Sequence, residues 1–593
     1  MGRTGGSRRR SPLLATGGSR RPSLLLAAIT ISLGLIAAGC GSSDPTPANP
    51  ATAPITVKPD PLAHAKFNTH PGPADAVLTQ RGDDTRLGWN STESTLTVAA
   101  VGSRNFGKRA AYPVDGKVYA QPLYVPKLRV GGQQHDVVIV ATQHDTVYAF
   151  DAHGTGAGTP PLWQSSLLQP GARTFQAASD RVGTNRLCDS ITPEVGISGT
   201  PVIDWAAQRI YVMALDVEHG KLTYRMHALS LATGQDVEPS TVVSAAVPGT
   251  GIDAVGGKVA FTASDEQQRM GLTLVNGVVY AGFSSWCGVS PYHGWVLGYA
   301  TKDLSRAIVY NATPDSYEGG LWESESGITV DDHGHLFIVT GNGPYDLNSG
   351  GRDVSDSLLE MVPHNGTLAV VDEFTPFDQL CRNQHDQDLG SGSPLLLPGN
   401  AEMVLSSKTG AVYVLSNGKL GGYTPITGDS CKQRDHTDVD KIKQELTIDS
   451  VPGGMWGTWG YWASTNGTYV YGSGSDGKPT QWRLTGNDTI DPTPVATAPE
   501  SFTFPGSIPV TSSDGGATGT GIVWTIDQTN GAVLRAFDAS DIGEEIFDST
   551  RDAGRDGLDD TNGFNHFDVP TIAGGLVFVG DQSHLEIFGL LNS

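Results

Sequence analysis

One short pattern, a strand followed by a polar turn and a second strand, recurs eight times along this 593-residue chain. It is clearest at residues 146–152, where β-branched and aromatic residues lead to Asp151, and Trp163 follows shortly after. Short runs of this kind, bounded by Gly, Asn and Asp, are typical of β-strands. The other copies lie at residues 227–234, 297–299, 359–361, 413–415, 481–484, 534–539 and 585–590.

The repeat predicts an all-β fold, a single eight-bladed β-propeller over residues 77–593. A four-stranded blade cannot bury both of its faces alone, so blades stack radially and the ring closes to hide its edges. We expect a strand near residues 105–109 to close the ring by completing the last blade beside residues 576–580. A pair of β-sandwiches and a seven-bladed ring are the alternatives.

The N-terminus has the features of an export signal. Six arginines and no acidic residue occur in the first 40 positions, and an apolar run over residues 24–38 leads to Gly39 and Cys40. The run is too short and too interrupted to span a membrane. It predicts a bacterial lipoprotein signal peptide over residues 1–39, lipidation of Cys40, and an extracytoplasmic protein anchored to the cell membrane. Cleavage nearby without lipidation, giving a soluble secreted protein, is the alternative; residues 19–25 also resemble a twin-arginine export motif.

Composition gives further expectations about the tether, the binding partners and the disulfides. Residues 40–76, which begin with the lipidated Cys40, are rich in Ser, Pro, Ala and Thr and predict a disordered tether. Without the signal peptide the chain has 33 basic and 62 acidic residues, a net charge of −29, so we expect no nucleic-acid partner. The four remaining cysteines have no metal-ligand spacing and predict two disulfides of open pairing. They are Cys188, Cys287, Cys381 and Cys431.

The repeated unit V-Y-A-F-D-A…L-W resembles the tryptophan-docking repeat of quinoprotein alcohol dehydrogenases and their non-catalytic propeller relatives, over residues 80–593. Residues 83–88 resemble the family's opening segment. Three stretches, residues 341–344, 356–359 and 385–388, follow in the order and rough spacing of the family's cofactor blades. The resemblance implies the quinone PQQ in the mouth of the ring, above a tryptophan, with Ca²⁺ or a lanthanide ion polarising its carbonyl.

The resemblance also implies roles for single residues. Trp322 corresponds to the flat aromatic floor, and Asn342 to the amide that binds the hard cation through oxygen. Asp388, with Asp386 as second choice, corresponds to the carboxylate that binds the cation and accepts the alcohol proton. Lys408 corresponds to the cation that contacts the cofactor and steadies the developing quinol oxyanion.

A further aromatic cluster, Trp456, Trp459, Tyr461 and Trp462, resembles a quinone-facing loop, with Trp456 as the cofactor contact. Every one of these site residues also has a purely structural interpretation. Tryptophans and asparagines pack blades or close turns, and aspartates cap strands. Flat aromatic surfaces also bind sugars, so the cluster does not identify its ligand.

The sequence departs from the family at three points. The region where the family's metal-binding glutamate is expected, residues 288–292, has no carboxylate, and Glu323 and Glu325 beside Trp322 are the alternatives. Adjacent cysteines, which cap the quinone in many members, are missing. The haem motif C-x-x-C-H is missing too, so any redox cycle needs an external electron acceptor.

Two functions are consistent with these observations. The first is a PQQ-dependent dehydrogenase that oxidises an alcohol or a sugar, which the four residues Trp322, Asn342, Asp388 and Lys408 favour. The second is a non-catalytic lipoprotein whose loops bind another envelope protein or a glycan, which the missing glutamate and disulfide favour. A serine hydrolase is disfavoured because residues 390–393 lack the G-x-S-x-G elbow.

Overall fold

The computed structural model describes residues 72–177, 179–180, 191–323, 326–434, 437–559 and 565–592. The chain divides into two units, residues 1–55 and 56–593, and all described residues belong to the second. The signal peptide, Cys40, the tether up to residue 71, Cys188 and Glu325 lie outside the described residues, so what the sequence predicts for them stays a prediction. Within the described ranges, no helix combines the length and apolarity needed to cross a membrane.

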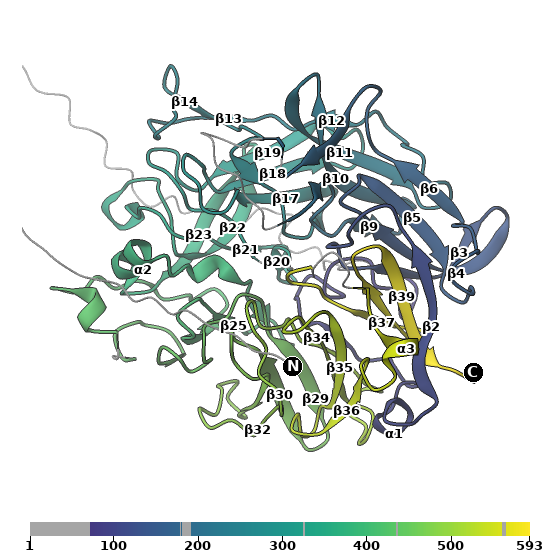
Figure 1. Cartoon of the computed structure of the whole chain (residues 1–593). Helices are drawn as coiled ribbons and strands as arrows, with labels where there is room; N and C mark the ends of the chain where they lie inside the picture. The colour runs from purple at the N-terminus through teal and green to yellow at the C-terminus, as the bar shows by residue number, and fades with distance from the viewer. Residues whose placement is uncertain are drawn as a thin grey trace, which may run out of the picture. The chain divides into compact units, whose positions relative to one another are not determined.

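Eight sheets of the described chain, each with four antiparallel strands, follow one another around a ring (Figure 1), which confirms the all-β, eight-bladed propeller. The repeat found in the sequence is the third strand of every blade. In β5, for example, the five residues Thr146–Phe150 are all buried, because both faces of a blade pack against neighbouring blades.

The first four blades are listed from their inner to their outer strands. Blade 1 contains β3 (Leu123–Val130), β4 (Gln133–Ala141), β5 (Thr146–Asp151) and β6 (Trp163–Ser166). Blade 2 contains β9 (Val202–Asp204), β10 (Arg209–Glu218), β11 (Lys221–Ser230) and β12 (Thr241–Val242), and β7 (Arg173–Gln176) and β8 (Glu194–Val195) extend it. Blade 3 contains β16 (Thr273–Val275), β17 (Val278–Ser285), β18 (Trp295–Ala300) and β19 (Arg306–Asn311), and β15 (Glu266–Gln267) extends it. Blade 4 contains β20 (Thr329–Val330), β21 (Leu336–Val339), β22 (Leu358–His364) and β23 (Thr367–Thr375), and β27 (Gly422–Tyr423) extends it.

The last four blades follow the same order. Blades 5 and 6 contain β24 (Leu395–Leu396), β25 (Glu402–Ser406), β26 (Val412–Ser416) and β28 (Gln444–Leu446), then β29 (Gly460–Ser464), β30 (Gly467–Gly472), β31 (Thr480–Leu484) and β32 (Ala496–Thr497). Blade 7 contains β33 (Val510–Ser512), β34 (Ile522–Asp527), β35 (Val533–Asp538) and β36 (Glu545–Asp548), and β1 (Trp89–Asn90) extends it. Blade 8 contains β37 (Thr571–Ala573), β38 (Leu576–Gly580), β39 (His584–Leu590) and β2 (Phe106–Pro113). The hairpin β13 (Ala246–Pro248) and β14 (Lys258–Ala260) and the helices α1 (Val98–Val101), α2 (Gln379–His385) and α3 (Ala553–Asp556) lie in connections.

The ring closes with a strand from the start of the domain, as the sequence predicts. Strand β2 pairs antiparallel with β39, from Phe106 opposite Leu590 to Pro113 opposite His584, and the two lie side by side in Figure 1. The direct neighbour of β2 is therefore β39, and the predicted neighbour at residues 576–580 is one strand further in. This pairing gives blade 8 its fourth strand and removes the open edge.

The tryptophan of the repeat docks one blade on the next. The Trp163 ring nitrogen, on the outer strand of blade 1, donates a hydrogen bond of 2.8 Å to the carbonyl of Leu231 after the third strand of blade 2. Gly234 lies against the indole ring, and a Cβ there would come within 2.4 Å of it. The glycine of the repeat is thus required for close approach of the indole.

Residues 77–93, which we call the axial segment, contact every blade at or next to its inner strand. Because the inner strands surround the axis of the ring, a segment that reaches all of them runs across that axis. The contacts join Val77 to Tyr124, Leu78 to Ile203, Arg86 to Thr273, Asp84 to Val330, Thr85 to Leu396, Arg81 to Trp459, Gly88 to Thr511 and Asn90 to Ile572.

Two arginines of the axial segment are buried and hydrogen-bonded within the ring. Arg81 donates from its guanidinium to the carbonyls of Arg86, Pro509 and Trp459. Burial, with a smaller contribution from Arg86, lowers the pKa of Arg81 to about 9. Arg86 donates to the carbonyls of Ile328 and Gln80 and to the Thr273 hydroxyl. The axial segment therefore stabilises the ring through polar contacts of its own.

Candidate functional site

The predicted site residues gather at the end of the ring opposite the axial segment. Trp322, Asp388 and Trp456 precede the inner strands β20, β24 and β29, whereas Asn342 and Lys408 follow the second strands β21 and β25. Because inner and second strands are antiparallel, all these positions lie at one end of their blades. We call the set Trp322, Asn342, Asp386, Asp388, Lys408 and Trp456 the mouth. The axial segment instead meets the last residues of β20 and β24.

Asp388 is the centre of the mouth. One of its carboxylate oxygens accepts the backbone N–H of Asn342 at 2.6 Å, and the other lies 2.5 Å from the Lys408 ammonium. Lys408 also donates to Asp386 at 2.9 Å. The Asp388 side chain is 4% exposed and that of Asp386 80% exposed, so the two acids meet different surroundings. Asp388 is the buried, positioned carboxylate of the pair.

The lysine of this pair keeps its charge. Burial lowers the pKa of Lys408, but the carboxylates of Asp388 and Asp386 offset this effect, and the pKa lies above its ordinary value. The ammonium also lies 4.6 Å from the centre of the Trp456 ring, in cation–π contact. Lys408 therefore joins the acids of the mouth to its aromatic side.

The three sequence stretches that carry the family resemblance meet at this point. Gly341 has no side chain, and a Cβ there would come within 2.4 Å of the Asp388 carboxylate and 3.0 Å of the Trp322 ring. Asp356, from the second stretch, accepts the backbone N–H of Leu389 at 3.0 Å. Asn342 donates from its side-chain amide to Asp386 at 2.8 Å. The order of the stretches in the sequence thus corresponds to real contacts.

Three buried polar atoms of the mouth have no hydrogen-bond partner in the described structure. They are the ring nitrogens of Trp322 and Trp456 and the side-chain oxygen of Asn342. A buried polar atom without a partner costs free energy, and native chains usually satisfy such atoms with water or a ligand. The Asn342 oxygen is the atom that the sequence predicts as a cation ligand.

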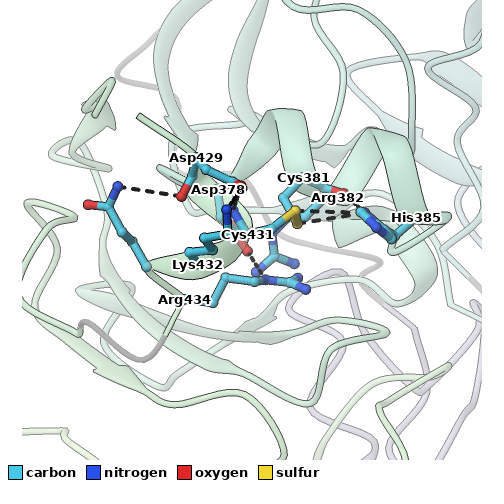
Figure 2. The surroundings of a disulfide bond; sticks show 9 residues. Asp378, Cys381, Arg382, His385, Asp429, Cys431, Lys432 and Arg434 are labelled. Carbon is cyan, nitrogen blue, oxygen red and sulfur yellow. Dashed lines mark hydrogen bonds and ion pairs between the residues drawn. A yellow bond between two sulfur atoms is a disulfide. The ribbon is translucent and has the colours of Figure 1, made fainter. Parts of the chain in front are cut away.

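Helix α2 delivers the acids to the mouth. It ends at His385, and Asp386 follows in the left-handed conformation with φ 53°, which turns the chain toward Asp388. Asp386 thus caps a helix, whereas its structural interpretation predicts a strand cap. Figure 2 shows the disulfide that fixes this helix, Cys381–Cys431, with the His385 ring facing both sulfurs at 3.7 and 3.8 Å. Cys287 is disulfide-bonded as well.

The predicted aromatic cluster does not form one surface. Trp459, Tyr461 and Trp462 are buried, and only Trp456 is partly exposed. Trp459 packs on Trp482, with ring centres 5.2 Å apart. The prediction that the cluster as a whole contacts a ligand is therefore wrong for its three buried members, because successive strand residues point into the packing between blades.

Glu323 belongs to the interior between the mouth and the axial segment. Its carboxylate accepts the backbone N–H of Val339 at 2.9 Å, and its side chain is fully buried. Burial raises the pKa of Glu323 to about 8, although the Val339 hydrogen bond and Arg86 lower it. One carboxylate oxygen of Glu323 is therefore already used in a hydrogen bond to the main chain.

Sequence reasoning missed Glu318, a second acid near Asp388. Burial and the charges of Asp388 and Asp386 raise the pKa of Glu318 to about 6. Its neighbour Gly319 donates to the backbone carbonyl of Asn342 at 2.6 Å, which places the two chain segments side by side. The signal in the sequence is an acid followed by two glycines, four residues before the predicted Trp322 floor.

Metal-ligating groups also gather elsewhere in the described chain. Two sets of side chains bring their ligand atoms within 4.8 Å of one another: Cys381, His385 and Cys431, and Asp559, Asp581 and His584. The first set is occupied by the disulfide, and neither includes an acid of the mouth. The mouth therefore offers oxygen ligands but no preformed cluster of three acids or histidines.

Comparison with known proteins identifies similar solved structures but no similar sequences. No family model and no curated protein matches the sequence. The quinohemoprotein alcohol dehydrogenases of Comamonas testosteroni and Pseudomonas putida HK5 superpose with a TM-score of 0.54 each, at 14% and 13% identity, over 87% and 88% of this chain and 81% of each of theirs. A europium-containing methanol dehydrogenase superposes with a TM-score of 0.52 at 13% identity, over 87% of this chain and 98% of its own. These likenesses establish a quinoprotein-like propeller fold.

Proposed function

We propose that this protein is a quinone-dependent dehydrogenase that oxidises an alcohol or a sugar at the mouth. The observation that carries the proposal is the meeting of Trp322, Asn342, Asp388 and Lys408 around one point, although they come from separate parts of the chain. The same end of the ring has three buried polar atoms without partners. The solved structures of similar fold include alcohol and methanol dehydrogenases.

The residues present fit PQQ and a hard cation. Trp322 offers a partly exposed indole face, which suits a flat conjugated ring. The Asn342 oxygen is buried and without a partner, and Asp388 adds a carboxylate; Ca²⁺ and lanthanide ions prefer such oxygen ligands. Asn342 and Asp388 would hold the cation, while Trp322, Lys408 and Trp456 would contact the cofactor. PQQ supplies, when bound, the acceptor for a hydride from the substrate's carbinol carbon.

Asp388 acts as the general base in this proposal. It is buried, and the Asn342 N–H holds one carboxylate oxygen while the other, which pairs with Lys408, would accept the hydroxyl proton of the substrate. Lys408 stays protonated and pairs with the Asp388 carboxylate at 2.5 Å before the reaction. When Asp388 accepts the hydroxyl proton, Lys408 becomes available to stabilise negative charge that develops beside it.

Reconstitution tests the proposal directly. The mature chain is incubated with PQQ and Ca²⁺, passed through gel filtration, and assayed for dye reduction with a panel of alcohols and aldoses. We expect quinone absorbance to elute with the protein and at least one substrate to reduce the dye. Protein that elutes without quinone absorbance would contradict the proposal. The Asn342→Ala variant is the matched comparison, because it removes the unpartnered oxygen.

We also propose that the enzyme works outside the cytoplasmic membrane, anchored through Cys40. The signal peptide motif supports this location, and the Cys381–Cys431 disulfide agrees with an oxidising compartment. Fractionation of cells that express the full chain and its Cys40→Ser variant tests the anchor. The proposal expects the first in the membrane fraction and the second in the medium or the periplasm; equal distribution of the two would contradict it.

A further inference from the structure

The hairpin β38–β39 of blade 8 carries three metal-ligating side chains on one face. Val579 pairs with Glu586 across the two strands, and the Asp581 N–H donates to the carbonyl of His584 at 3.0 Å. Opposed residues of an antiparallel pair share a face of the sheet, and side chains alternate along each strand. The side chains of Asp581, His584 and Glu586 therefore lie on the same face.

A fourth ligand-type side chain, Asp559, reaches this face from the connection between α3 and blade 8. Its carboxylate lies 3.7 Å from the Nδ1 atom of His584, and the carboxylate of Asp581 lies 3.9 Å from the same atom. The ligand atoms of these three residues all lie within 4.8 Å of one another. Bonds from Zn²⁺ to nitrogen and oxygen are about 2.0–2.2 Å long, so one ion can contact all three after small side-chain shifts.

Hydrogen bonds hold the acids of this cluster in place. One Asp581 oxygen accepts the N–H groups of Ser583 and His584 at 3.0 and 2.7 Å, and the other accepts the N–H of Asp559 at 2.9 Å. The Ser583 hydroxyl donates to Asp559 and lies 2.9 Å from the Nδ1 atom of His584. A carboxylate oxygen has two lone pairs, and carboxylates that bind metals are normally hydrogen-bonded in this way. The acids are thus oriented and can still bind an ion.

Glu586 adds an observation that hydrogen bonds within the cluster do not explain. Its side chain is 3% exposed; one oxygen pairs with the Lys108 ammonium at 3.2 Å, and the other is buried with no hydrogen-bond partner in the described structure. Burial raises the pKa of Glu586 to about 8, Lys108 lowers it, and the neighbouring Asp581 raises it again. A buried carboxylate oxygen without a partner is costly, and a cation beside Asp581 would satisfy it.

The cluster is open to solvent on one side and closed on the other. The His584 and Asp559 side chains are 32% and 19% exposed, whereas that of Asp581 is 2% exposed. An ion can therefore enter past His584 and exchange its water for the inner acids. Three carboxyl groups of the cluster face the single ammonium of Lys108, so the local charge attracts a cation.

We propose that Asp559, Asp581, His584 and Glu586 bind one divalent transition-metal ion, for which Zn²⁺ is the probe. Imidazole together with carboxylates suits Zn²⁺, whereas Ca²⁺ prefers oxygen ligands alone. The site belongs to blade 8, and the mouth to blades 4, 5 and 6, so the proposal does not depend on the proposed dehydrogenase.

The ion would strengthen the closure of the ring. Helix α3, which leads to Asp559, lies beside the closing strand β2 (Figure 1), and the Lys108 N–H of β2 donates to the Asp556 carboxylate of α3 at 2.9 Å. Lys108 also contacts Glu586 of β39. A cation held by Asp559 and by the hairpin would join the same two segments a second time.

Calorimetry on the whole mature chain tests the site. Protein freed of metal with a chelator is titrated with Zn²⁺ and, separately, with Ca²⁺, in the absence of PQQ. The imidazole ligand predicts one Zn²⁺ per chain that depends on His584 and binds at least about tenfold more tightly than Ca²⁺. Equal affinity for the two ions would indicate an ordinary acidic surface and overturn the proposal.

Variants assign the bound ion to the cluster. His584→Gln and Asp559→Asn each remove a ligand at a partly exposed position, and each should weaken Zn²⁺ binding by about 10²-fold or more. His219→Gln, an exposed histidine in the β10–β11 turn, is the matched control and should bind Zn²⁺ as the native chain does. Asp388→Asn, at the mouth, should also keep this ion. Unchanged Zn²⁺ affinity in His584→Gln would refute the assignment.

Glu586→Gln separates metal binding from a proton shared between two acids. A ligand carboxylate predicts Zn²⁺ binding at least about tenfold weaker in this variant, and unchanged affinity would overturn the four-ligand site. Thermal unfolding gives a second measurement, because an ion that binds only the folded chain raises its Tm. Zn²⁺ should raise the Tm of the native chain and of His219→Gln but not that of His584→Gln. An equal rise in all three would contradict the proposal.

Discussion

The axial segment and the mouth lie at opposite ends of the same ring, and they differ in how their buried polar groups are hydrogen-bonded. The axial segment buries Arg81 and Arg86, and their guanidinium groups donate to carbonyls and hydroxyls of the surrounding chain. The mouth buries Asn342, Trp322 and Trp456 and leaves a polar atom of each without a partner. The contrast is between two buried guanidinium groups that are hydrogen-bonded and three buried polar atoms of the mouth that are not.

Unpartnered buried atoms also occur elsewhere in the described chain, for example on Trp459. At the mouth, three of them lie on Trp322, Asn342 and Trp456, which the family resemblance assigns to the cofactor or the cation. They surround an ion pair, Asp388 with Lys408, that would be costly to bury for stability alone. Substitutions at the two ends therefore test this difference, and their expected effects are given from the largest to the smallest.

The largest effect is expected at the axial segment. Arg86→Ala removes the buried guanidinium that donates to the carbonyls of Ile328 and Gln80, and each lost hydrogen bond costs about 1–3 kcal/mol. We expect the free energy of unfolding in urea to fall by roughly 3–6 kcal/mol. The exposed control Arg129→Ala should leave the midpoint unchanged. A loss below about 1 kcal/mol in Arg86→Ala would mean that the axial segment does not hold the ring.

The mouth should respond in activity and hardly in stability. Asp388→Asn removes the proposed base, and loss of general-base catalysis predicts a kcat lower by about 10²–10⁴-fold in protein loaded with PQQ and Ca²⁺. Dye reduction measures the rate. Asp386→Asn is the matched control and should keep most of the activity, since Asp386 is exposed. The assignment is wrong if the two variants exchange these behaviours.

Glu323 joins the two ends and adds a pH dependence. Its pKa in the folded chain, about 8, lies above the ordinary 4.5, so between pH 4.5 and 8 unfolding releases a proton. The unfolded state binds fewer protons, and stability therefore falls as the pH rises through this window. Glu323→Gln is uncharged at every pH and should be more stable than the native chain at pH 9, by up to roughly 4 kcal/mol.

The two proteins should converge below about pH 4, where the native carboxyl is protonated in both states. Urea denaturation at several pH values measures the difference. Glu544→Gln, an exposed acid in the β35–β36 turn, should show no such trend. Parallel stability curves for Glu323→Gln and the native chain would show that Glu323 is ionised in the fold.

The smallest effect is expected at the aromatic floor. Trp322→Ala removes a partly exposed ring, and loss of a stacking contact worth about 0.5–1.5 kcal/mol predicts PQQ binding weaker by roughly tenfold or less. Quenching of the remaining tryptophan fluorescence measures the dissociation constant. Trp205→Ala, in the β9–β10 turn, removes a partly exposed indole away from the mouth and should bind PQQ as the native chain does. Equal affinities in the two variants would place the quinone elsewhere.

Much of the fold could be predicted from the sequence because a propeller repeats one local rule. Each third strand needs apolar residues on both faces and a polar turn, and this requirement is visible at residues 146–152 and in every later copy. Local rules do not state which strand the closing segment meets. The predicted neighbour was residues 576–580, whereas β2 pairs with β39, because pairing depends on the edge left open by the rest of the blade.

The candidate site, like the fold, could be predicted from the sequence only in part. Its residue types and their order, Trp322, Asn342, Asp388 and Lys408, were present in the sequence, and the tertiary structure brought them together. Burial was decided only in three dimensions: it separates Asp388 from Asp386, two residues apart, and Trp456 from its buried neighbours. The nearness of Glu318 to Asp388 joins residues from different blades, which no spacing along the chain reveals.

The sequence by itself determined the repeating all-β ring and the chemical groups at its loops, because both depend on residue type and short-range pattern. Only the tertiary structure decided which groups face one another and which polar atoms remain without partners. Those properties arise from long-range packing, in which the buried guanidinium groups of Arg81 and Arg86 are hydrogen-bonded and three buried polar atoms of the mouth are not.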